Sequence, residues 1–389
     1  MHVLVIGSGL IGTATAWYLR REGADVTVVD RAAGPARETS FANAGMLTPS
    51  MADPWNAPGV VWKLLGWVGR EDAPMLLRPR EIPRLAGWGT RFLWNSRVAS
   101  FERNMLKNLA LASFSLDALR ELRAGLGLRY CERSFGVLKV FRDSASLAKA
   151  VTVAEQLAER GVVHRALDRE GVAEVEPSLA PVAGQLAGGI LHPDDESGDA
   201  HRFVCALAEA ASGAGVRFEF DTAVTGLRAE GNRLTAVATT AGDLGVDACV
   251  LAAGSYSTPL LAGLGIRLPV RPVKGYSITV PFGDDSLAPR RPITDDALHI
   301  AVTPFGDRLR VAGTAEFTGL DHSVGEPRIR NLREMFETMF PRCAATVDPD
   351  ADLSPWSGLR PMSVDGVPVL GATPLANLYL NTGHGHLGW

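Results

Sequence analysis

The sequence is poor in cysteine and carries no excess of positive charge. Its four cysteines, Cys131, Cys205, Cys249 and Cys343, are far apart and form no C-x-x-C pair. Neither a disulfide framework nor a zinc site is therefore expected. The 39 basic and 43 acidic residues give a net charge of −4, which lacks the electrostatic footprint of a nucleic-acid-binding protein. We expect a reducing, cytoplasmic setting and no nucleic-acid partner.

Long apolar runs are also missing. The longest candidate, residues 59–69, is too short to span a bilayer, which takes roughly 20 apolar residues. Its length favours a buried core helix, and a helix lying on a membrane surface is the alternative. Residues 2–6 are apolar, and no basic segment or cleavage site precedes them, so no export signal is expected.

The composition that remains is typical of a folded globular protein, with 46% hydrophobic and 21% charged residues. A chain of 389 residues is long for a single core and suits two domains, or one domain with a large insertion. The sequence contains no internal repeat and no low-complexity segment. Apolar runs at 2–6 and 25–29 flank a helical pattern at 10–21, which predicts a βαβ opening.

The remaining periodicities predict a second α/β unit and an antiparallel sheet. Residues 270–313 alternate in antiparallel style, as at 276–280 and 308–312. The chain thus passes twice between a nucleotide-binding domain and an α+β domain. The other predicted elements are helices at 84–125, 144–160, 201–211 and 327–340, strands at 135–141, 216–220 and 248–252, and a hairpin turning at 231–232.

A glycine motif opens the first predicted helix. Residues 7–12 match G-x-G-x-x-G directly after the first strand, where the glycines allow a tight turn, close approach to a pyrophosphate and helix–strand packing. Asp30 ends the second strand 30 − 12 = 18 residues after Gly12, near the roughly 20-residue spacing of an acid that binds ribose hydroxyls. This context favours FAD or NAD over NADP, the alternative being a glycine turn with a solvated Asp30.

Residues 38–45 combine small side chains, hydroxyls and an amide. Such a segment could cradle a pyrophosphate and line the flat face of a flavin. Composition alone is equally compatible with an ordinary polar loop, so the choice between FAD and NAD stays open at this point.

Further motifs recur along nearly the whole chain in a set order. They occupy residues 7–12 with 17–19, 38–40 with 42–45, 55–59, 271–276, 358–361 with 365–366, and 382–389. Together they resemble the small-subunit type of D-amino-acid dehydrogenase, within the superfamily of D-amino-acid oxidase, glycine oxidase and sarcosine oxidase. The resemblance implies α/β plus α+β architecture. A Rossmann-type FAD-binding domain would comprise residues 1–85, 193–268 and 352–389, and an antiparallel-sheet substrate domain residues 86–192 and 269–351.

The resemblance also implies FAD as the cofactor. Residues 253–254, which follow the strand at 248–252, would form a second turn in contact with the flavin. Without the resemblance they would be interpreted as an ordinary strand end. The implied cofactor contacts are Gly7, Gly9, Gly12, Asp30 and Arg31 for the adenosine diphosphate part, Thr39, Ser40, Asn43, Ala44 and Gly45 near the pyrophosphate and isoalloxazine, Val224 at the adenine, Ala253 and Gly254 at the second turn, and Gly383, Gly385, His386, Leu387 and Gly388 at the pyrimidine edge.

Three residues are candidate catalytic groups by the same resemblance. Arg360 would grip an amino-acid carboxylate bidentately, although an arginine before proline is otherwise a surface ion-pair partner. Tyr276 would be a second hydrogen-bond partner, with a buried structural tyrosine as the alternative. His384 titrates near neutrality, but hydride transfer from a neutral amine needs no strong base, so it is first a flavin-loop residue. Lys274 is expected to be solvated.

The acidic stretch at 192–199 has no second histidine at ligand spacing, so no metal site is expected there. A polar loop that crosses between the domains explains these residues better.

The function implied by the resemblance is oxidative deamination of a D-amino acid. Hydride would pass from Cα to flavin N5, giving an imino acid and then a keto acid. The alternatives are a D-proline or hydroxyproline-type dehydrogenase that gives a cyclic imine, an oxygen-using amino-acid oxidase, and a nucleotide-binding protein without catalysis. The implied partners are a small amino-acid substrate and a respiratory quinone or other electron acceptor, with peripheral contact at the inner membrane and an oligomer left open.

Two features set this sequence apart from those it resembles. They continue past the position of Trp389 into a helix whose N-terminus points at the flavin, so we expect a truncated chain or weaker cofactor retention. Position 386 is histidine, where D-alanine-type dehydrogenases commonly have a small hydroxyl residue. The substrate side chain therefore stays open.

Overall fold

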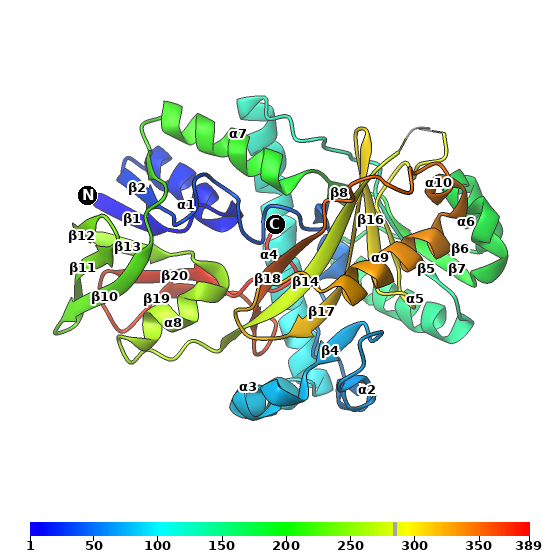
Figure 1. The fold of residues 1–389 in the computed structure, drawn as a ribbon, viewed down its shortest axis with the longest axis horizontal. Helices are drawn as coiled ribbons and strands as arrows, with labels where there is room; N and C mark the ends of the chain where they lie inside the picture. The colour runs from blue at the N-terminus through cyan, green and yellow to red at the C-terminus, as the bar shows by residue number, and fades with distance from the viewer. Residues whose placement is uncertain (283–285) are drawn as a thin grey trace.

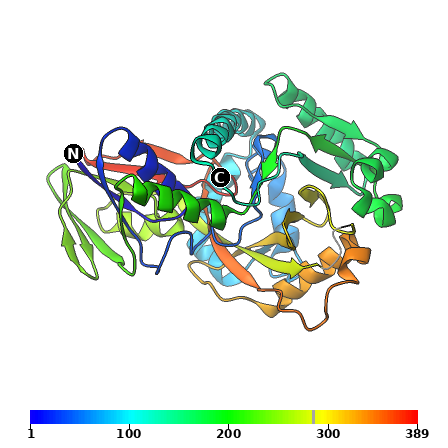
Figure 2. The ribbon, with the colours of Figure 1, turned by 90° about the horizontal axis from the view of Figure 1, so that it is seen from above.

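Two large β-sheets stand side by side and are joined by several passages of the chain (Figure 1). The computed structural model describes residues 1–282 and 286–389. The N-terminus lies at one far end of the molecule and the C-terminus near the middle, between the two halves (Figure 2). The fold is therefore α/β plus α+β, as the sequence predicts.

The first sheet is of Rossmann type, with the strand order β19-β20-β13-β1-β2-β9. Its parallel strands are short apolar runs because helices cover both faces of the sheet and leave no side exposed to water. An antiparallel edge strand, β19, closes one side. The bounds are β1 His2–Ile6, β2 Asp25–Val29, β9 Arg217–Glu219, β13 Ala248–Leu251, β19 Val369–Ala372 and β20 Leu378–Thr382.

Two helices pack on one face of this sheet, and a small sheet with a short helix covers the other. Ala16 and Trp17 of the first helix are buried in one core with Phe203 and Leu207 of its neighbour. The first face carries α1 Leu10–Arg21 and α7 Ala200–Gly213, and the second carries α8 Ser257–Ala262 with the strands β10 Val224–Glu230, β11 Arg233–Thr239 and β12 Gly242–Leu244.

The second sheet has the order β18-β14-β17-β16-β15-β5-β7-β6, with β4 paired to the far end of β17. Its central strands are antiparallel and long, and α9 packs over them around Leu332 and Phe336. The bounds are β4 Met75–Leu77, β5 Val137–Phe141, β6 Arg165–Leu167, β7 Gly188–His192, β14 Val270–Pro281, β15 Ile293–Asp295, β16 Ile300–Phe305, β17 Arg308–Phe317, β18 Trp356–Ser363 and α9 Glu326–Met339.

A long helix, α4 (Val98–Leu126), runs past the junction of the two halves (Figure 1). Leu116 and Leu119 join the core of the first half, while Asn108 donates hydrogen bonds to the carbonyls of Ala52 and Gly366. The remaining elements are α2 Val60–Trp67, α3 Ile82–Trp94, α5 Ser144–Ala158, α6 Arg169–Val175, α10 Pro341–Ala344, β3 Met46–Leu47, β8 Glu196–Ser197, and the 3₁₀ turns at 49–51, 79–81, 177–185 and 254–256.

Two details differ from the sequence expectations. The helical region at 84–125 is two helices, because the chain turns between Trp94 and Val98. The prediction of a buried core helix at 59–69 is wrong. In α2 only Val60 is buried, and Trp62 is 77% exposed. One side of α2 faces a cavity and the other faces solvent, and only Val60 and Leu64 of this helix join a hydrophobic cluster.

The expected domain boundaries stay predictions. Two strands from within the expected FAD-binding segments, β4 and β18, hydrogen-bond in the second sheet, so the pairing groups them with the substrate sheet. Across residues 1–282 and 286–389, no helix has the length and apolarity needed to cross a membrane.

We predict that Glu196→Gln weakens the packing of α4 on β8. The buried Glu196 carboxylate accepts hydrogen bonds from Arg120 Nε at 2.7 Å and Arg123 Nη1 at 2.6 Å. Neutralising it should lower the free energy of unfolding by about 2–3 kcal/mol in urea titrations, because two partly buried guanidinium groups lose their acceptor. Glu326→Gln, on the exposed Glu326–Arg330 pair of α9, should change it by less than about 0.5 kcal/mol. Equal effects of the two variants would exclude this role for Glu196.

Candidate active site

A large cavity lies between the two sheets. Its volume is about 900 Å³, near the upper end of the range for ligand pockets. One end is lined by the carboxyl ends of β1, β2, β13 and β20, the edge at which open parallel sheets bind ligands. The other is lined by β14, β17 and β18. A ligand that fills it would touch both halves.

The turn at residues 7–12 fits an anionic group. Gly7 has φ +106°, and a Cβ on Gly12 would lie 1.8 Å from the Gly7 carbonyl oxygen, so both positions require glycine. Gly9 faces the cavity, and a Cβ there would meet only Ser40 Oγ within 4 Å. Helix α1 begins here without a side-chain cap or an acidic first turn. Its N-terminal amides therefore favour a phosphate.

Asp30 lies beside this turn and lines the cavity. Its Oδ2 accepts hydrogen bonds from the backbone N and the Oγ of Ser8, both at 2.7 Å, and its Oδ1 accepts one from the Ala32 amide. A carboxylate has about four acceptor positions, so one remains for a ribose hydroxyl. Asp30 thus also holds the glycine turn in shape.

The backbone of the loop at 38–45 is held by the second sheet. Three successive carbonyl oxygens accept hydrogen bonds from side chains on three neighbouring strands, β14, β17 and β16. The pairs are Ala42 O with Ser277 Oγ at 2.7 Å, Asn43 O with Arg310 Nη1 at 3.1 Å, and Ala44 O with Thr303 Oγ1 at 2.7 Å. The loop predicted to cradle the cofactor is therefore attached to the sheet predicted to hold the substrate.

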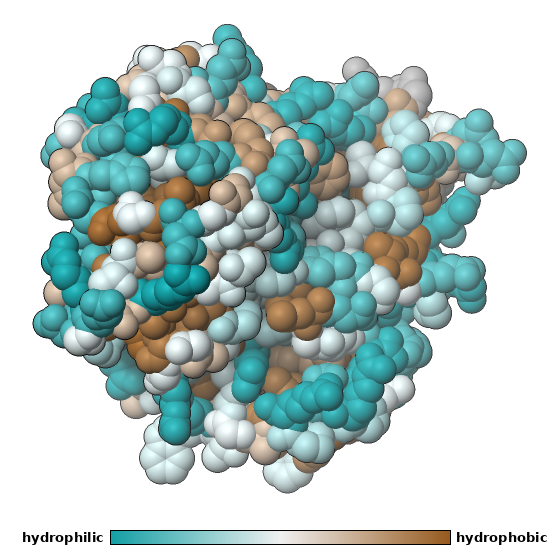
Figure 3. Space-filling model, turned by 60° about the vertical axis from the view of Figure 1, so that its left-hand side comes forward, coloured by the Kyte–Doolittle hydropathy of each residue, from teal (hydrophilic) through white to brown (hydrophobic). Residues whose placement is uncertain are grey.

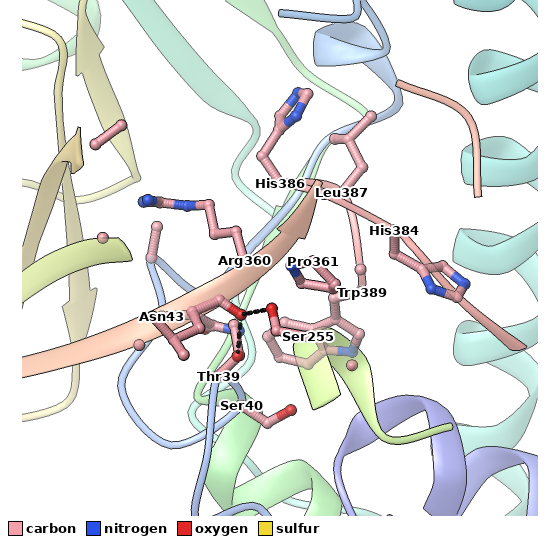
Figure 4. A pocket seen from close by; sticks show the side chains of 18 of the residues that line it. Thr39, Ser40, Asn43, Ser255, Arg360, Pro361, His384, His386, Leu387 and Trp389 are labelled. Carbon is pink, nitrogen blue, oxygen red and sulfur yellow. Dashed lines mark hydrogen bonds between the residues drawn. The ribbon is translucent and has the colours of Figure 1, made fainter. Parts of the chain in front are cut away.

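Two hydroxyl groups of the first half also bind the second sheet. Here the second sheet supplies the acceptor, whereas in the three preceding bonds it supplies the donors. The Leu359 carbonyl on β18 accepts hydrogen bonds from Thr39 Oγ1 and Ser255 Oγ, both at 3.0 Å (Figure 4). Ser40 Oγ accepts the Leu10 amide of α1 at 3.1 Å. Asn43 Oδ1 accepts the Gly45 amide, which fixes the left-handed turn at Gly45 (φ +66°).

Arg360 lies on β18 with its guanidinium over Gly275 of β14. A Cβ on Gly275 would lie 2.0 Å from Arg360 Nη1, so only glycine permits this placement. Opposite Gly275, β17 carries an extra residue, because Lys274 pairs with Glu316 and Tyr276 with Gly313. This β-bulge bends β17 and interrupts its hydrogen-bond ladder with β14.

The bulge supplies a backbone carbonyl that accepts a hydrogen bond from Arg360. Thr314 adopts φ +57°, unusual for a β-branched residue, and its carbonyl accepts Arg360 Nη1 at 3.3 Å. Burial lowers the pKa of Arg360 to about 10, which leaves the group charged at neutral pH. A half-buried cation with four further N–H donors is suited to a carboxylate ligand.

Two residues of β14 differ from their expected roles. Tyr276 lines the cavity with its ring, but its hydroxyl donates a hydrogen bond to the buried Glu316, and burial beside that carboxylate raises the pKa of Tyr276. The hydroxyl is thus directed to Glu316 rather than to a ligand. Lys274 is not solvated as expected. It is 2% exposed and bonds Asp321 at 2.8 Å and the Ser323 carbonyl at 2.9 Å, because both faces of β14 are covered at this point.

The two histidines of the C-terminal segment differ in direction. His384 points away from Arg360, whereas His386 lies in the part of the cavity near Trp55 (Figure 4). Burial lowers the pKa of each to about 4. Both rings are therefore neutral at pH 7. Both histidines line the cavity, and a catalytic role for His384 stays a prediction.

The other predicted cofactor residues also lie at or near the cavity. Arg31 lines it but is engaged by Glu38 and stacks over Tyr256, 3.8 Å from the ring centroid. The lining further includes Val224, Ala253, Gly254, Gly385, Leu387 and Gly388, while Gly383 packs against Val270 and Val369 just outside it.

Sequence reasoning assigned no role to Gly275 and Thr314 and no ligand contact to Trp55. Gly275 and Trp55 fell within motifs that the resemblance covers. The bulge at Thr314 has no sequence signal, because its bulged residue is not a glycine.

FAD fits three features of this site. They are the glycine turn, the uncapped N-terminus of α1 and a cavity lined by both sheets. The sequence model of the FAD-dependent oxidoreductases matches residues 2–389. The chain belongs to this family. This FAD-dependent oxidoreductase is 46% identical to a D-amino acid dehydrogenase of Bradyrhizobium diazoefficiens and 42% identical to one of Vibrio vulnificus. Both alignments cover the whole chain and 91% and 92% of the relatives.

Solved structures share the fold of this oxidoreductase. Glycine oxidase from Geobacillus kaustophilus matches 99% of this chain and 90% of its own, with a TM-score of 0.75 and 24% identity. L-proline dehydrogenase from P. horikoshii matches 100% of this chain and 88% of its own, with a TM-score of 0.77 and 16% identity. At these identities the likeness concerns the fold alone.

We predict opposite outcomes for two alanine substitutions in the glycine turn. Gly12→Ala should lower the free energy of unfolding by about 1–3 kcal/mol, because its methyl overlaps the Gly7 carbonyl. Gly9 has φ −71°, so Gly9→Ala should fold normally but lose FAD, because its methyl enters the cavity. Urea unfolding and the flavin absorbance retained after gel filtration measure the two effects. A stable Gly12→Ala, or full FAD retention by Gly9→Ala, would contradict this assignment.

Proposed function

We propose that this FAD-dependent oxidoreductase oxidatively deaminates a D-amino acid, giving an imino acid that water hydrolyses to a keto acid. Its relatives at 42–46% identity over the full chain are D-amino acid dehydrogenases. Bound FAD supplies the acceptor of the Cα hydride. The observation that carries the proposal is the half-buried Arg360 guanidinium, which lies in the same cavity as the cofactor turn.

The residues of the second sheet position the substrate. Arg360 binds the carboxylate through two parallel N–H donors, which fixes the position and orientation of Cα. The Thr314 carbonyl restrains the guanidinium on one side. Gly275 lets it lie flat on the sheet. The amino acid is thereby held with one face toward the cofactor side of the cavity.

The cofactor is held by the first sheet and the loop at 38–45. Gly9 and the start of α1 would receive the pyrophosphate, and Asp30 the ribose. The strand end at Val224 would meet the adenine. Thr39, Ser40 and Asn43 support the loop through their own hydrogen bonds, so their role is mainly to shape the flavin site.

We predict that Arg360→Ala raises the substrate KM roughly 30- to 1000-fold, because a bidentate charge-assisted contact contributes about 2–4 kcal/mol. Arg360→Lys keeps the positive charge but loses the paired donors of the guanidinium, so its KM should lie between those of the wild type and Arg360→Ala. Steady-state kinetics with a D-amino acid and an artificial dye acceptor measure this. The matched control is Arg271→Ala, on β14 but outside the cavity lining. An unchanged KM for Arg360→Ala would remove it from the site.

We also propose that the electron acceptor is a respiratory quinone and that the protein reaches it at a membrane surface. Helices α2 and α3 lie together beyond the sheets (Figure 1). The face seen in Figure 3 is mostly hydrophilic, with hydrophobic colour chiefly in recesses. By contrast, residues 60–97, here called the arm, expose large apolar side chains: Trp62, Leu65, Ile82, Leu93 and Trp94.

The charge of the arm differs in sign from that of the rest of the chain. It has seven basic and three acidic residues, 7 − 3 = +4, against 32 − 40 = −8 elsewhere. Arg97 stacks on Trp94 with its Cζ 3.3 Å from the ring centroid. Basic groups beside exposed tryptophans suit the interface of an anionic bilayer. The inner side of α2 lines the cavity through Lys63 and Trp67, so the bound surface lies next to the active site.

We predict that the holoenzyme sediments with vesicles of phosphatidylglycerol and phosphatidylethanolamine, and less so at high salt. The double variant Trp62→Ser with Trp94→Ser should weaken this binding about tenfold or more, because two large aromatic side chains no longer enter the interface. Phe114→Ser, at an exposed aromatic on α4, is the control and should bind normally. Equal binding by the double variant would exclude the arm as the contact.

A further inference from the structure

Trp55 and His386 form a stacked aromatic pair in the wall of the cavity. Their ring centroids are 5.4 Å apart with planes at 25°, and both residues line the cavity. They come from opposite parts of the chain, since Trp55 precedes α2 and His386 follows β20. The stack therefore exists only in the folded protein.

The stack lies within one substrate length of Arg360. The Arg360 Cζ is 5.6 Å from the Trp55 ring centroid. An amino acid whose carboxylate sits on the guanidinium places its side chain a few ångströms away, which is the region that Trp55 borders. Direct guanidinium stacking would be tighter than 5.6 Å, so space is left beside the ring.

The aromatic wall is held in place by packing. Burial lowers the pKa of His386 to about 4, so its ring is uncharged near pH 7. Trp55 packs against the cluster of Val60, Trp88 and Met362. Gly385 adopts φ +58°, with its position closely packed on Met362, so the turn that presents His386 is restrained. Asp53 lines the cavity beside His386 and would repel an anionic side chain.

We propose that Trp55 and His386 form the subsite for the substrate side chain and select flat side chains. The inference rests on the proposed function, because it takes Arg360 as the carboxylate anchor. A flat ring can insert parallel to the stack and gain aromatic contact, whereas a saturated ring of the same carbon skeleton is thicker and lacks the π face. Trp55 and His386 are thus specificity-determining residues, and D-phenylalanine is a preferred substrate.

The test compares D-phenylalanine with D-cyclohexylalanine, which have the same skeleton. In the holoenzyme, kcat/KM should favour D-phenylalanine by about tenfold, the size of a favourable aromatic pair. Trp55→Leu should bring the ratio near one, Trp55→Phe should keep most of it, and His386→Ser should lower it. Phe114→Ala, outside the cavity, should leave the ratio unchanged. A wild-type ratio of one, or a ratio unaffected by Trp55→Leu, overturns the proposal.

A binding measurement separates this inference from the proposed function. Titration calorimetry of the holoenzyme with 3-phenylpropionate and 3-cyclohexylpropionate, which cannot be deaminated, should show the same preference and its loss in Trp55→Leu. If that preference is found but no D-amino acid is oxidised, the proposed function fails and the subsite stands. If D-amino acids are oxidised without preference for the flat ring, the function stands and the subsite fails.

Discussion

The attachment of the loop at 38–45 to the second sheet sets the distance between the two halves of this oxidoreductase. Its three consecutive carbonyls are bound by side chains of β14, β16 and β17, while the Leu359 carbonyl of β18 is bound by Thr39 and Ser255. Buried carbonyls are costly to leave without donors, so these bonds define one relative placement of the sheets. The cavity, and with it the spacing between the cofactor turn and Arg360, depends on that placement.

Within this frame, the site is shaped as much by missing side chains as by functional groups. Gly12 lets α1 pack on the turn, Gly9 leaves the cavity open beside the turn, and Gly275 leaves room for the Arg360 guanidinium. The bulge at Thr314 then presents a carbonyl that the regular ladder would have used. Local strain of this kind persists where the surrounding sheet is well packed, and β14 and β17 are almost fully buried here.

Charge is distributed to match these roles. Glu196 is a buried acid paired with Arg120 and Arg123, whereas the hydrogen bond from Arg360 to the Thr314 carbonyl leaves most of the guanidinium donors for a ligand. The two histidines near it are neutral because burial disfavours their charged forms. The cavity therefore presents the Arg360 guanidinium near the neutral rings of Trp55 and His386, with Asp53 also in the lining.

The sequence by itself determined the βαβ opening and most helices and strands, because glycine spacing and apolar periodicity are local signals. The family followed from the resemblance of its motifs along the whole chain. The sequence also pointed to Arg360 through a contiguous motif. It misjudged the segments at 59–69 and Lys274, since burial there depends on which distant strand lies opposite. Only the tertiary structure decided that Tyr276 faces Glu316, that Thr314 restrains Arg360, and that Trp55 meets His386. These pairings join residues tens to hundreds of positions apart, and no local preference of the chain encodes them.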